Sequence, residues 1–300
     1  MAHDLVLAAD IGGTQMRAAL VGENGQVVLR RSAPTPSEAD AAAALIELIR
    51  SVGASDEGSR VAHAVVGLPG AVDYRVGRLL WAPNLPEAWP DLLSRDKLSA
   101  KLGMRTYVAN DADLAAVGEA SALAGNRTAD LAYLTISTGI GAGVVLGGEL
   151  VAGNRSLAEV GHTVIDWRAW RDGKAATLEE LASGTGVARQ AREAGLGNLD
   201  AAAVAAAADE GDPTATSIWS AAIAAGAAGV ANLIMCFSPS LVVIGGGLGR
   251  RDQFFRPLRQ IVMRHRAQFP DDLDVVASGL GDDAGLVGAA RWESLSGVAQ

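Results

Sequence analysis

The sequence has one cysteine, Cys236, and four histidines among its 300 residues. A single cysteine excludes an internal disulfide bond and a zinc site made of cysteines from this chain. No histidine lies in an H-E-x-x-H sequence, so we do not expect a metal centre built by protein side chains alone. Lysine is also scarce, since the sequence contains only Lys97, Lys101 and Lys174. We interpret that scarcity as compositional bias.

Positive charge is in deficit, because the formal net charge is −9 at pH 7. We therefore expect no general binding to nucleic acids or anionic membranes. The N-terminus carries Asp4 and enters an apolar strand at once, unlike a signal peptide. Residues 213–249 carry no charge and are long enough to span a bilayer. They are dominated by alanine and glycine and contain Asn232, so we predict a buried helix, then a strand, in a soluble, cytoplasmic protein.

Two common nucleotide-binding motifs are missing. No glycine-rich turn is followed by lysine, so a Walker-type loop is not supported. The dinucleotide fingerprint G-x-G-x-x-G is also absent, because GIGAGV and GGGLGR both lack the last glycine. A nucleotide site in this chain must therefore use another kind of loop.

Apolar strands alternate with helical segments along the chain. LVLAADIGG leads through a turn into MRAALVGENGQVVLRRS, in which Glu23-Asn24-Gly25 is the expected hairpin turn. DLAYLTISTGIGAGVVLGGELV repeats this arrangement in the second half of the chain. Helices are expected after a Ser37 cap, from about Asp111, and over AGLVGAARWESLS at the end. The alternation predicts an α/β fold whose ligands bind at the carboxyl ends of strands.

The two turns, DIGGT and STGIGAG, carry glycines and hydroxyl residues. Glycines let backbone N–H groups approach an anion, and Thr14, Ser137 and Thr138 add hydroxyl donors. One such loop is common in ordinary hairpins, but two in different halves indicate a phosphate held between domains. A carboxylate such as Asp10 would repel that phosphate unless Mg²⁺ lies between them. The alternative is that Asp10 is only a polar residue closing a strand.

Two further stretches carry candidate acid–base or sugar-binding groups. Asp111, in YVANDADLAAVGEA, follows an apolar strand at a helix N-terminus, where it could accept a proton from a hydroxyl. We expect the helix dipole to keep it ionised, although simple helix capping by NDAD explains the residue equally well. Glu159 and His162 are three apart, so a helix-like turn would point both the same way. Alone, such a pair is more typical of a solvated surface.

Six motifs occur in the order found in the ROK family of sugar kinases and repressors: DIGGT, GLPGAVD, NDAD, STGIGAG, EVGH and LVVIGGGLG. The chain resembles this family from Leu5 to about Gly288. The resemblance implies an actin-like ATPase (ribonuclease H-like) fold, in which two α/β domains flank an interdomain cleft. The implied domains are residues 1–115 with 288–300, and residues 116–287. A homodimer is also implied.

The resemblance implies roles for individual residues. Asp111 is the catalytic base, and Asp10 lies near Mg²⁺, which it contacts through water. Residues on the ATP side are Asp10, Gly12, Gly13, Thr14, Thr138, Gly139, Gly186, Gly246 and Gly247. Residues on the sugar side are Pro69, Gly70, Asn84, Asn110, Asp111, Glu159, His162 and Glu179. Neighbouring Glu180 is an open alternative to Glu179.

One motif departs from the family pattern. Many members follow the Glu/His pair with C-x-C-G-x-x-G-C-x-E, whose cysteines bind a structural zinc together with the histidine. Here Trp170, Asp172 and Thr177 stand at the cysteine positions. We therefore predict no structural zinc. Packing around Trp167 and Trp170 is our hypothesis for what holds His162 instead.

The resemblance implies an ATP- and Mg²⁺-dependent kinase of the hexokinase/glucokinase type that acts in carbohydrate metabolism, with glycolysis as the pathway if the sugar is glucose. The frequency of substrates within the family favours glucose as the sugar, whereas the residues themselves suit glucose, N-acetylglucosamine or N-acetylmannosamine alike. Polyphosphate in place of ATP is a second alternative. A non-catalytic sugar sensor is a third, although the strand beginning at residue 5 leaves no room for an N-terminal helix-turn-helix.

Overall fold

The computed structural model describes residues 4–12, 14–36, 41–82, 89–123, 130–153, 155–156 and 159–295. The chain divides into two compact units. The first comprises residues 1–129, 143–158 and 282–300, and the second comprises residues 130–142 and 159–281. The domain limits 1–115 with 288–300 and 116–287 stay a prediction. The structural division groups residues 116–129, 143–158 and 282–287 with the first unit.

The first unit contains a five-stranded sheet in the order β3-β2-β1-β4-β7. Strands β1, β2 and β3 are antiparallel neighbours, whereas β4 and β7 extend the sheet in parallel with β1. The bounds are β1 Leu5–Ile11, β2 Gln15–Gly22, β3 Val27–Pro34, β4 Val61–Leu68 and β7 Thr106–Asn110. Gly25 has φ +82° between β2 and β3, which confirms the predicted hairpin turn.

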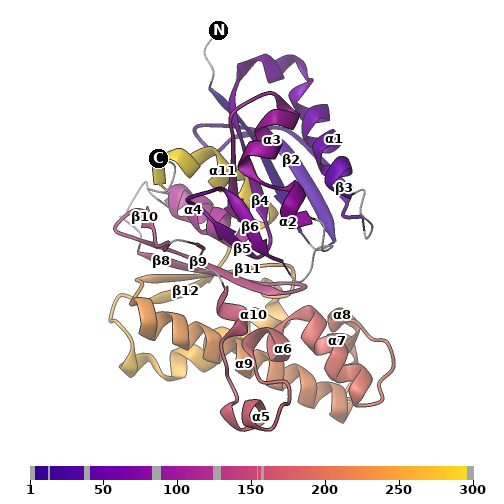
Figure 1. The fold of residues 1–300 in the computed structure, drawn as a ribbon. Coiled ribbons are helices and arrows are strands. Elements are labelled where there is room, and N and C mark those ends of the chain that lie inside the picture. The colour runs from indigo at the N-terminus through magenta and orange to yellow at the C-terminus, as the bar shows by residue number, and fades with distance from the viewer. Residues whose placement is uncertain are drawn as a thin grey trace. The chain divides into compact units, whose positions relative to one another are not determined.

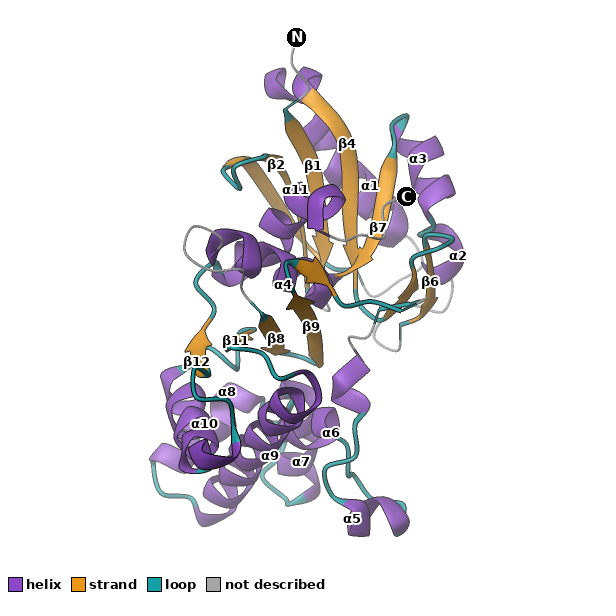
Figure 2. Ribbon diagram, turned by 90° about the vertical axis from the view of Figure 1, so that its left-hand side faces the viewer, coloured by secondary structure: helices purple, strands orange, loops and turns teal. Residues whose placement is uncertain are grey.

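Helices cover both faces of this sheet. Helices α1 (Ala41–Gly53) and α3 (Arg95–Leu102) lie on one face, and α4 (Asp111–Leu123) and α11 (Ala284–Leu295) lie on the other (Figure 1). Figure 2 shows β2, β1, β4 and β7 side by side beneath α11. The remaining elements of the unit are η1 Asp56–Arg60, β5 Ala71–Asp73, β6 Arg78–Trp81, α2 Trp89–Leu92 and β10 Glu149–Leu150. The Ser37 cap predicted for α1 lies outside the described residues.

Glycines let α4 and α11 approach closely. A Cβ added at Gly288 would lie 2.6 Å from the carbonyl carbon of Leu114, and one added at Gly118 would lie 2.9 Å from the Gly288 nitrogen. Real Cβ atoms do not come that near to backbone. The helix predicted over the closing stretch is therefore confirmed as α11, and it is fixed against the helix that begins at Asp111.

The second sheet has the order β10-β9-β8-β11-β12, and the division between the units falls within β9. Strands β8, β11 and β12 are parallel, and β9 and β10 are antiparallel. Thus a hairpin precedes parallel strands, as in the first sheet. The bounds are β8 Leu131–Ile136, β9 Ile140–Leu146, β11 Leu241–Gly245 and β12 Asp274–Ala277. This repetition agrees with the internal repeat of architecture seen in the sequence.

The helices of the second unit surround one long central helix, α9 (Pro213–Phe237), which contacts α6, α7, α8, α10 and β8. Within the described residues, α9 is the one helix long and apolar enough to cross a membrane, and half of its apolar window is buried. Trp219 of α9 packs edge to face on Phe254 of α10. The predicted buried helix followed by a strand is confirmed as α9 and β11. The other bounds are η2 Glu159–His162, α5 Trp167–Arg171, α6 Leu178–Ala182, α7 Gly184–Glu193, α8 Ala201–Asp209, α10 Asp252–Arg264, η3 Arg266–Gln268 and η4 Gly281–Asp283.

Candidate active site

Asp10 lies at the carboxyl end of β1, opposite Arg17 in the register of β1 and β2. The Arg17 Nη1 atom is 3.5 Å from Asp10 Oδ2, and Arg17 Nη2 is 3.6 Å from Asp282 Oδ2. Burial raises the pKa of the Asp10 carboxyl, although Arg17 opposes that shift. A cation bound near this carboxyl group would stabilise its ionised form, because a nearby positive charge lowers the pKa of a carboxyl group.

The turn after Asp10 exposes groups that suit an anion. Gly12 donates its N–H to the Gln15 carbonyl at 2.8 Å, and the Thr35 hydroxyl donates to the Gly12 carbonyl at 2.7 Å. These two hydrogen bonds use both backbone groups of Gly12, whereas Thr14 is exposed to solvent. Gly13 lies outside the described residues.

Asn110, the last residue of β7, caps α4. Its Oδ1 accepts the N–H groups of Ala112 and Asp113 at 2.9 and 3.0 Å, and its Nδ2 donates to the Gly70 carbonyl at 3.0 Å. Gly70 has φ +98°, and a Cβ there would lie 2.9 Å from Ala82 Cα. Pro69 and Gly70 therefore lie in a tight turn, and the Gly70 carbonyl of that turn contacts the capping residue Asn110. Because Asn110 performs the capping, Asp111 is not needed for it.

Asp10 and Asp111 both lie close to Gly285, the second residue of α11. A Cβ built on Gly285 would be 3.8 Å from Asp10 Cγ and 3.9 Å from the Asp111 carbonyl oxygen. Gly67 of β4 makes similar room, since its Cβ would be 3.4 Å from Asp10 Oδ1. The structure thus brings these two aspartates together at the ends of β1 and β7.

Burial, followed by the neighbouring Asp10 carboxylate, raises the pKa of Asp111 to about 8. The hydrogen bond from the Ala112 N–H opposes this shift but does not cancel it. The expectation that the helix N-terminus keeps Asp111 ionised is therefore wrong for the chain alone. Desolvation and a like charge outweigh the helix dipole, which contributes only a fraction of an elementary charge.

The Asp10 carboxyl group fits a Mg²⁺ ion that arrives with a nucleotide. Mg²⁺ takes oxygen ligands, keeps several waters, and is commonly held by one or two carboxylates together with substrate phosphates. Asp10 is a hard oxygen donor beside a turn with exposed donors, as that arrangement requires. No cluster of three acidic, histidine or cysteine side chains suited to a permanently bound metal occurs in the described ranges.

In the second unit, the turn Ser137–Gly139 joins β8 to β9, and residues at the start of α7 hydrogen-bond to its carbonyl groups. Gly184 donates its N–H to the Ser137 carbonyl at 2.7 Å, and the Thr185 hydroxyl donates to the Thr138 carbonyl at 2.7 Å. Glu179 Oε2 accepts the Ile140 N–H at 2.7 Å. The N–H groups of Thr138 and Gly139 donate to no atom of the described chain, and Thr138 is exposed. Such a turn can receive an anion.

Glu159 and His162 lie in η2, so the predicted helix-like turn is confirmed. Their side chains lie side by side, with Nε2 of His162 3.5 Å from Oε2 of Glu159. Buried Gly161 places this turn against Glu179, because a Cβ on it would lie 3.3 Å from Glu179 Cβ. Three of the predicted sugar-side residues are therefore neighbours within the second unit. The sequence reasoning missed Gly161, whose only signal was a glycine between two polar residues.

Two of the three remaining predicted glycines, Gly186 and Gly246, have clear packing reasons. A Cβ on buried Gly186 would be 2.7 Å from the Glu179 carbonyl oxygen, and Gly246 has φ +81° with a Cβ position 2.6 Å from the Ile136 carbonyl carbon. By contrast, a Cβ on exposed Gly247 would meet nothing within 4 Å. The proposed nucleotide roles of these three residues stay predictions. Asn84 lies outside the described residues.

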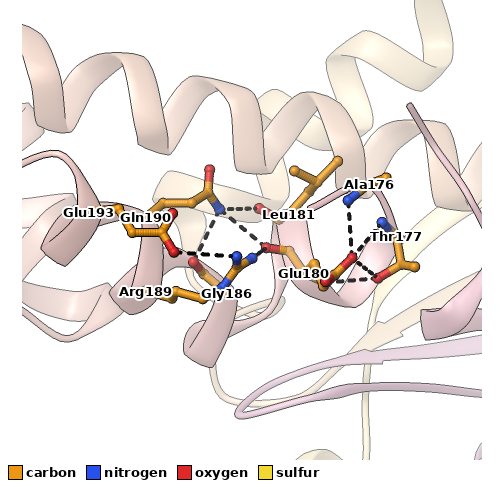
Figure 3. Close-up of polar contacts among 8 residues, drawn as sticks. All are labelled: Ala176, Thr177, Glu180, Leu181, Gly186, Arg189, Gln190 and Glu193. Atoms are coloured by element: carbon orange, nitrogen blue, oxygen red, sulfur yellow. Dashed lines mark hydrogen bonds and ion pairs between the residues drawn. The ribbon is translucent and has the colours of Figure 1, made fainter. Parts of the chain in front are cut away.

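Glu180 is occupied in a structural task, which separates it from Glu179. Figure 3 shows its side chain turned toward Ala176 and Thr177, whose N–H groups it accepts at 3.0 and 3.1 Å. These bonds, led by the one from Ala176, lower the pKa of Glu180. The Glu180 carbonyl oxygen accepts a hydrogen bond from Arg189 Nη2 at 2.9 Å. Gln190 Nε2 donates to the neighbouring Leu181 carbonyl at 3.1 Å. Glu180 therefore completes a capping box at α6.

The segment at the zinc-motif positions is held by backbone bonds. Ile165 donates to the Ala176 carbonyl at 2.8 Å, and Leu178 donates to the Thr163 carbonyl at 3.0 Å. Trp167 and Trp170 are 58% and 64% exposed. These exposed fractions give no support to the hypothesis that packing around the two tryptophans holds His162. The backbone bonds join residues 163–166, which follow His162 in the chain, to residues 176–178.

We predict that the purified protein contains no stoichiometric zinc. Only His162 of the family's zinc ligands is present, and one imidazole cannot hold a tetrahedral structural site. Metal analysis by mass spectrometry after dialysis checks this directly. One zinc per chain would contradict it.

Comparison with known proteins places this arrangement in a family. A model of the ROK family matches residues 6–294. The bifunctional enzyme NanE/NanK of Brucella suis is 39% identical over 95% of this chain, which spans about half the length of that relative. An N-acetylmannosamine kinase of Shigella flexneri is 32% identical over 95% of this chain and 97% of its own length. The crystal structure of a ROK glucokinase of Streptomyces griseus with glucose and AMPPNP is 29% identical, with a TM-score of 0.77 over 96% of this chain and 98% of its own. With its two sheets of matching design and a family match over almost its full length, this chain has the actin-like ATPase fold and belongs to the ROK family.

Proposed function

We propose that the chain is a sugar kinase that transfers the γ-phosphate of ATP to the 6-hydroxyl of a hexose, with Asp111 as the general base. The observation that carries this proposal is the position of Asp111, next to Asp10 at the carboxyl ends of β1 and β7 and with a pKa of about 8. A general base works best when its pKa is near the operating pH. Membership of the ROK family supports phosphotransfer to a sugar.

The Asp111 carboxyl group can divide its two oxygens between structure and chemistry. Oδ1 accepts the Ala112 N–H at 2.9 Å, which fixes the rotation of the carboxyl group. We assign Oδ2 the task of accepting the proton of the sugar hydroxyl as that oxygen attacks phosphorus. Positioning and charge stabilisation supply most of the remaining catalysis in phosphoryl transfer.

The two glycine turns are proposed to bind phosphate oxygens. Thr14 offers a hydroxyl from the first turn, and Thr138 and Gly139 offer N–H groups from the second. Preorganised donors of this kind stabilise the charge that develops on a transferring group. Asp10 would hold Mg²⁺ through water, and the ion would supply neutralisation of phosphate charge. Gly186, Gly246 and Gly247 are proposed to lie along the nucleoside.

Glu179, rather than Glu180, is proposed to contact the sugar, together with Glu159 and His162. We expect Glu180→Ala to lower the free energy of unfolding by about 1 kcal/mol, the usual loss for a helix cap, with little change in the KM for sugar. Glu179→Ala should raise that KM at least tenfold, since about 1.4 kcal/mol of binding is worth that factor. Steady-state kinetics and urea denaturation of the matched pair test this. A larger KM effect from Glu180→Ala would reverse the assignment.

The pH dependence follows from the raised pKa of Asp111. Only the ionised carboxylate is a base, so kcat/KM for the sugar should fall about tenfold per pH unit below about 8. In Asp111→Asn this limb should be absent. The same shift makes the folded chain bind a proton more tightly than the unfolded chain between 3.8 and about 8, so its contribution to stability is lost as pH rises through that window. A limb at the ordinary aspartate pKa would contradict the assignment.

Glucose is the first candidate substrate, and N-acetylmannosamine is the second. The glucokinase structure with bound glucose supports the first, and the full-length match to an N-acetylmannosamine kinase supports the second. ADP release from MgATP should be measured with glucose, mannose, fructose, N-acetylglucosamine, N-acetylmannosamine and no sugar. Turnover with one sugar confirms the kinase and names its substrate. Turnover with polyphosphate but not ATP would change the donor, and sugar binding without turnover would indicate a sensor.

The family resemblance also supports a homodimer in the cytoplasm. Light scattering on the purified protein tests the first of these expectations. The assay panel does not depend on either of them.

A further inference from the structure

Tyr74, in the turn after β5, lies behind the proposed base and is not used by the mechanism above. The side chain is 5% exposed. Its hydroxyl donates to Asp113 Oδ2 at 2.5 Å and accepts the Asn110 N–H at 3.2 Å. Burial, reinforced by the Asp113 carboxylate, raises the pKa of the phenol well above its ordinary value. The hydroxyl therefore stays protonated and serves as a permanent donor.

The two partners of this hydroxyl flank Asp111 in the sequence. Asn110 precedes the base, and Asp113 follows it by two residues and is fully buried. A carboxylate so buried is costly unless hydrogen bonds compensate it. The phenol supplies a hydrogen bond, and it does so from a different segment of the chain. One oxygen atom thus joins the end of β7 to the first turn of α4.

We propose that Tyr74 and Asp113 form a positioning pair that fixes the carboxyl group of Asp111. The proposal rests on Asp111 being the base of the proposed kinase. The Tyr74 ring is itself held by Trp292 of α11, with ring centroids 5.4 Å apart. Three segments therefore meet at this phenol: the turn after β5, the β7–α4 junction and α11. The backbone of Asn110 and the side chain of Asp113, which flank Asp111 in the sequence, are both hydrogen-bonded to this one phenol oxygen.

Positioning has a signature that differs from simple stability. A displacement of about 1 Å can cost about a hundredfold in rate, yet it leaves the groups that bind sugar in place. Loss of the pair should therefore lower kcat and leave the KM for sugar nearly unchanged. A purely structural hydrogen bond would lower the melting temperature with kcat preserved in the folded fraction.

The chain offers a matched control for the tyrosine. Tyr107 is also buried, and its hydroxyl also donates to a carboxylate, that of Glu293. Tyr107→Phe thus makes the same chemical change within the same unit but away from Asp111. Turnover of the two variants is compared at saturating sugar and MgATP, well below their melting temperatures and above the pKa of Asp111.

We expect Tyr74→Phe to lower kcat at least tenfold with KM for sugar within twofold, and Tyr107→Phe to leave both unchanged. Asp113→Asn retains an oxygen that accepts the phenol hydrogen, so it should keep most of the wild-type kcat. Asp113→Leu cannot accept it and should behave like Tyr74→Phe. Equal kcat in the two Phe variants, or equal loss in Asp113→Asn and Asp113→Leu, would overturn the positioning role.

The failure of this proposal is distinguishable from failure of the proposed function. If Asp111→Asn is inactive while Tyr74→Phe keeps a normal kcat, the base stands and the positioning pair falls. If Asp111→Asn keeps normal turnover, the base assignment falls, and the pair falls with it.

Discussion

Asp111→Asn is expected to reduce kcat by about 10²–10⁴-fold, the usual worth of a general base. The amide has nearly the same shape as the carboxylate and can still accept the Ala112 N–H through its oxygen, so the first turn of α4 should keep its geometry. It cannot take a proton from the sugar hydroxyl. The change therefore removes the chemistry and preserves the local structure.

Sugar binding should largely survive this substitution. Titration calorimetry with the sugar identified in the assay panel should give a Kd within a few-fold of the wild type. Asp96→Asn is the matched control. Asp96 also lies in the first turn of a helix, α3, and its ion-pair partner is Arg95. It should leave kcat unchanged. Turnover above one-tenth of the wild type in Asp111→Asn would refute the base assignment.

Gly288→Ala is expected to destabilise the protein by about 3 kcal/mol, the upper part of the range for overpacked cores. The added methyl would lie 2.6 Å from the Leu114 carbonyl carbon and 2.9 Å from the Gly118 nitrogen. Both neighbours are backbone atoms of α4, which cannot rotate aside as a side chain can. The helix pair must therefore separate, or the chain must fail to fold.

Urea denaturation measures this effect, with soluble yield as a second readout if the variant does not accumulate. Gly53→Ala is the matched control within a helix, since its added methyl would meet only a Leu7 methyl carbon at 3.4 Å. Alanine favours helices over glycine by up to about 1 kcal/mol, so the control should be neutral or slightly stabilising. A loss below about 1 kcal/mol in Gly288→Ala would show that α4 and α11 can relax apart.

The sequence by itself determined the family and the order of the elements. Five of the six local motifs mark the ends of strands, and the sixth, EVGH, forms η2. Local rules sufficed because the glycines or capping residues of these motifs act within a few positions. The hairpin at Gly25, the start of α4 at Asp111 and the closing helix over residues 284–295 follow from such rules. The candidate base and both glycine turns were likewise visible in the sequence.

Only the tertiary structure decided how these groups behave. The sequence could not separate capping from catalysis at NDAD, because both functions use the same residues; the hydrogen bonds assign the cap to Asn110. It gave the wrong ionisation for Asp111, since burial and Asp10 come from elements far apart in the chain. It could not divide Glu179 from Glu180, whose side chains point to different partners: Glu179 accepts the Ile140 N–H, and Glu180 accepts the Ala176 N–H. It also missed Tyr74 and Asp113, because a buried pair 39 residues apart leaves no local pattern. Local sequence preferences determine the turns, whereas desolvation and long-range contacts determine the ionisation and hydrogen bonding of the side chains in those turns.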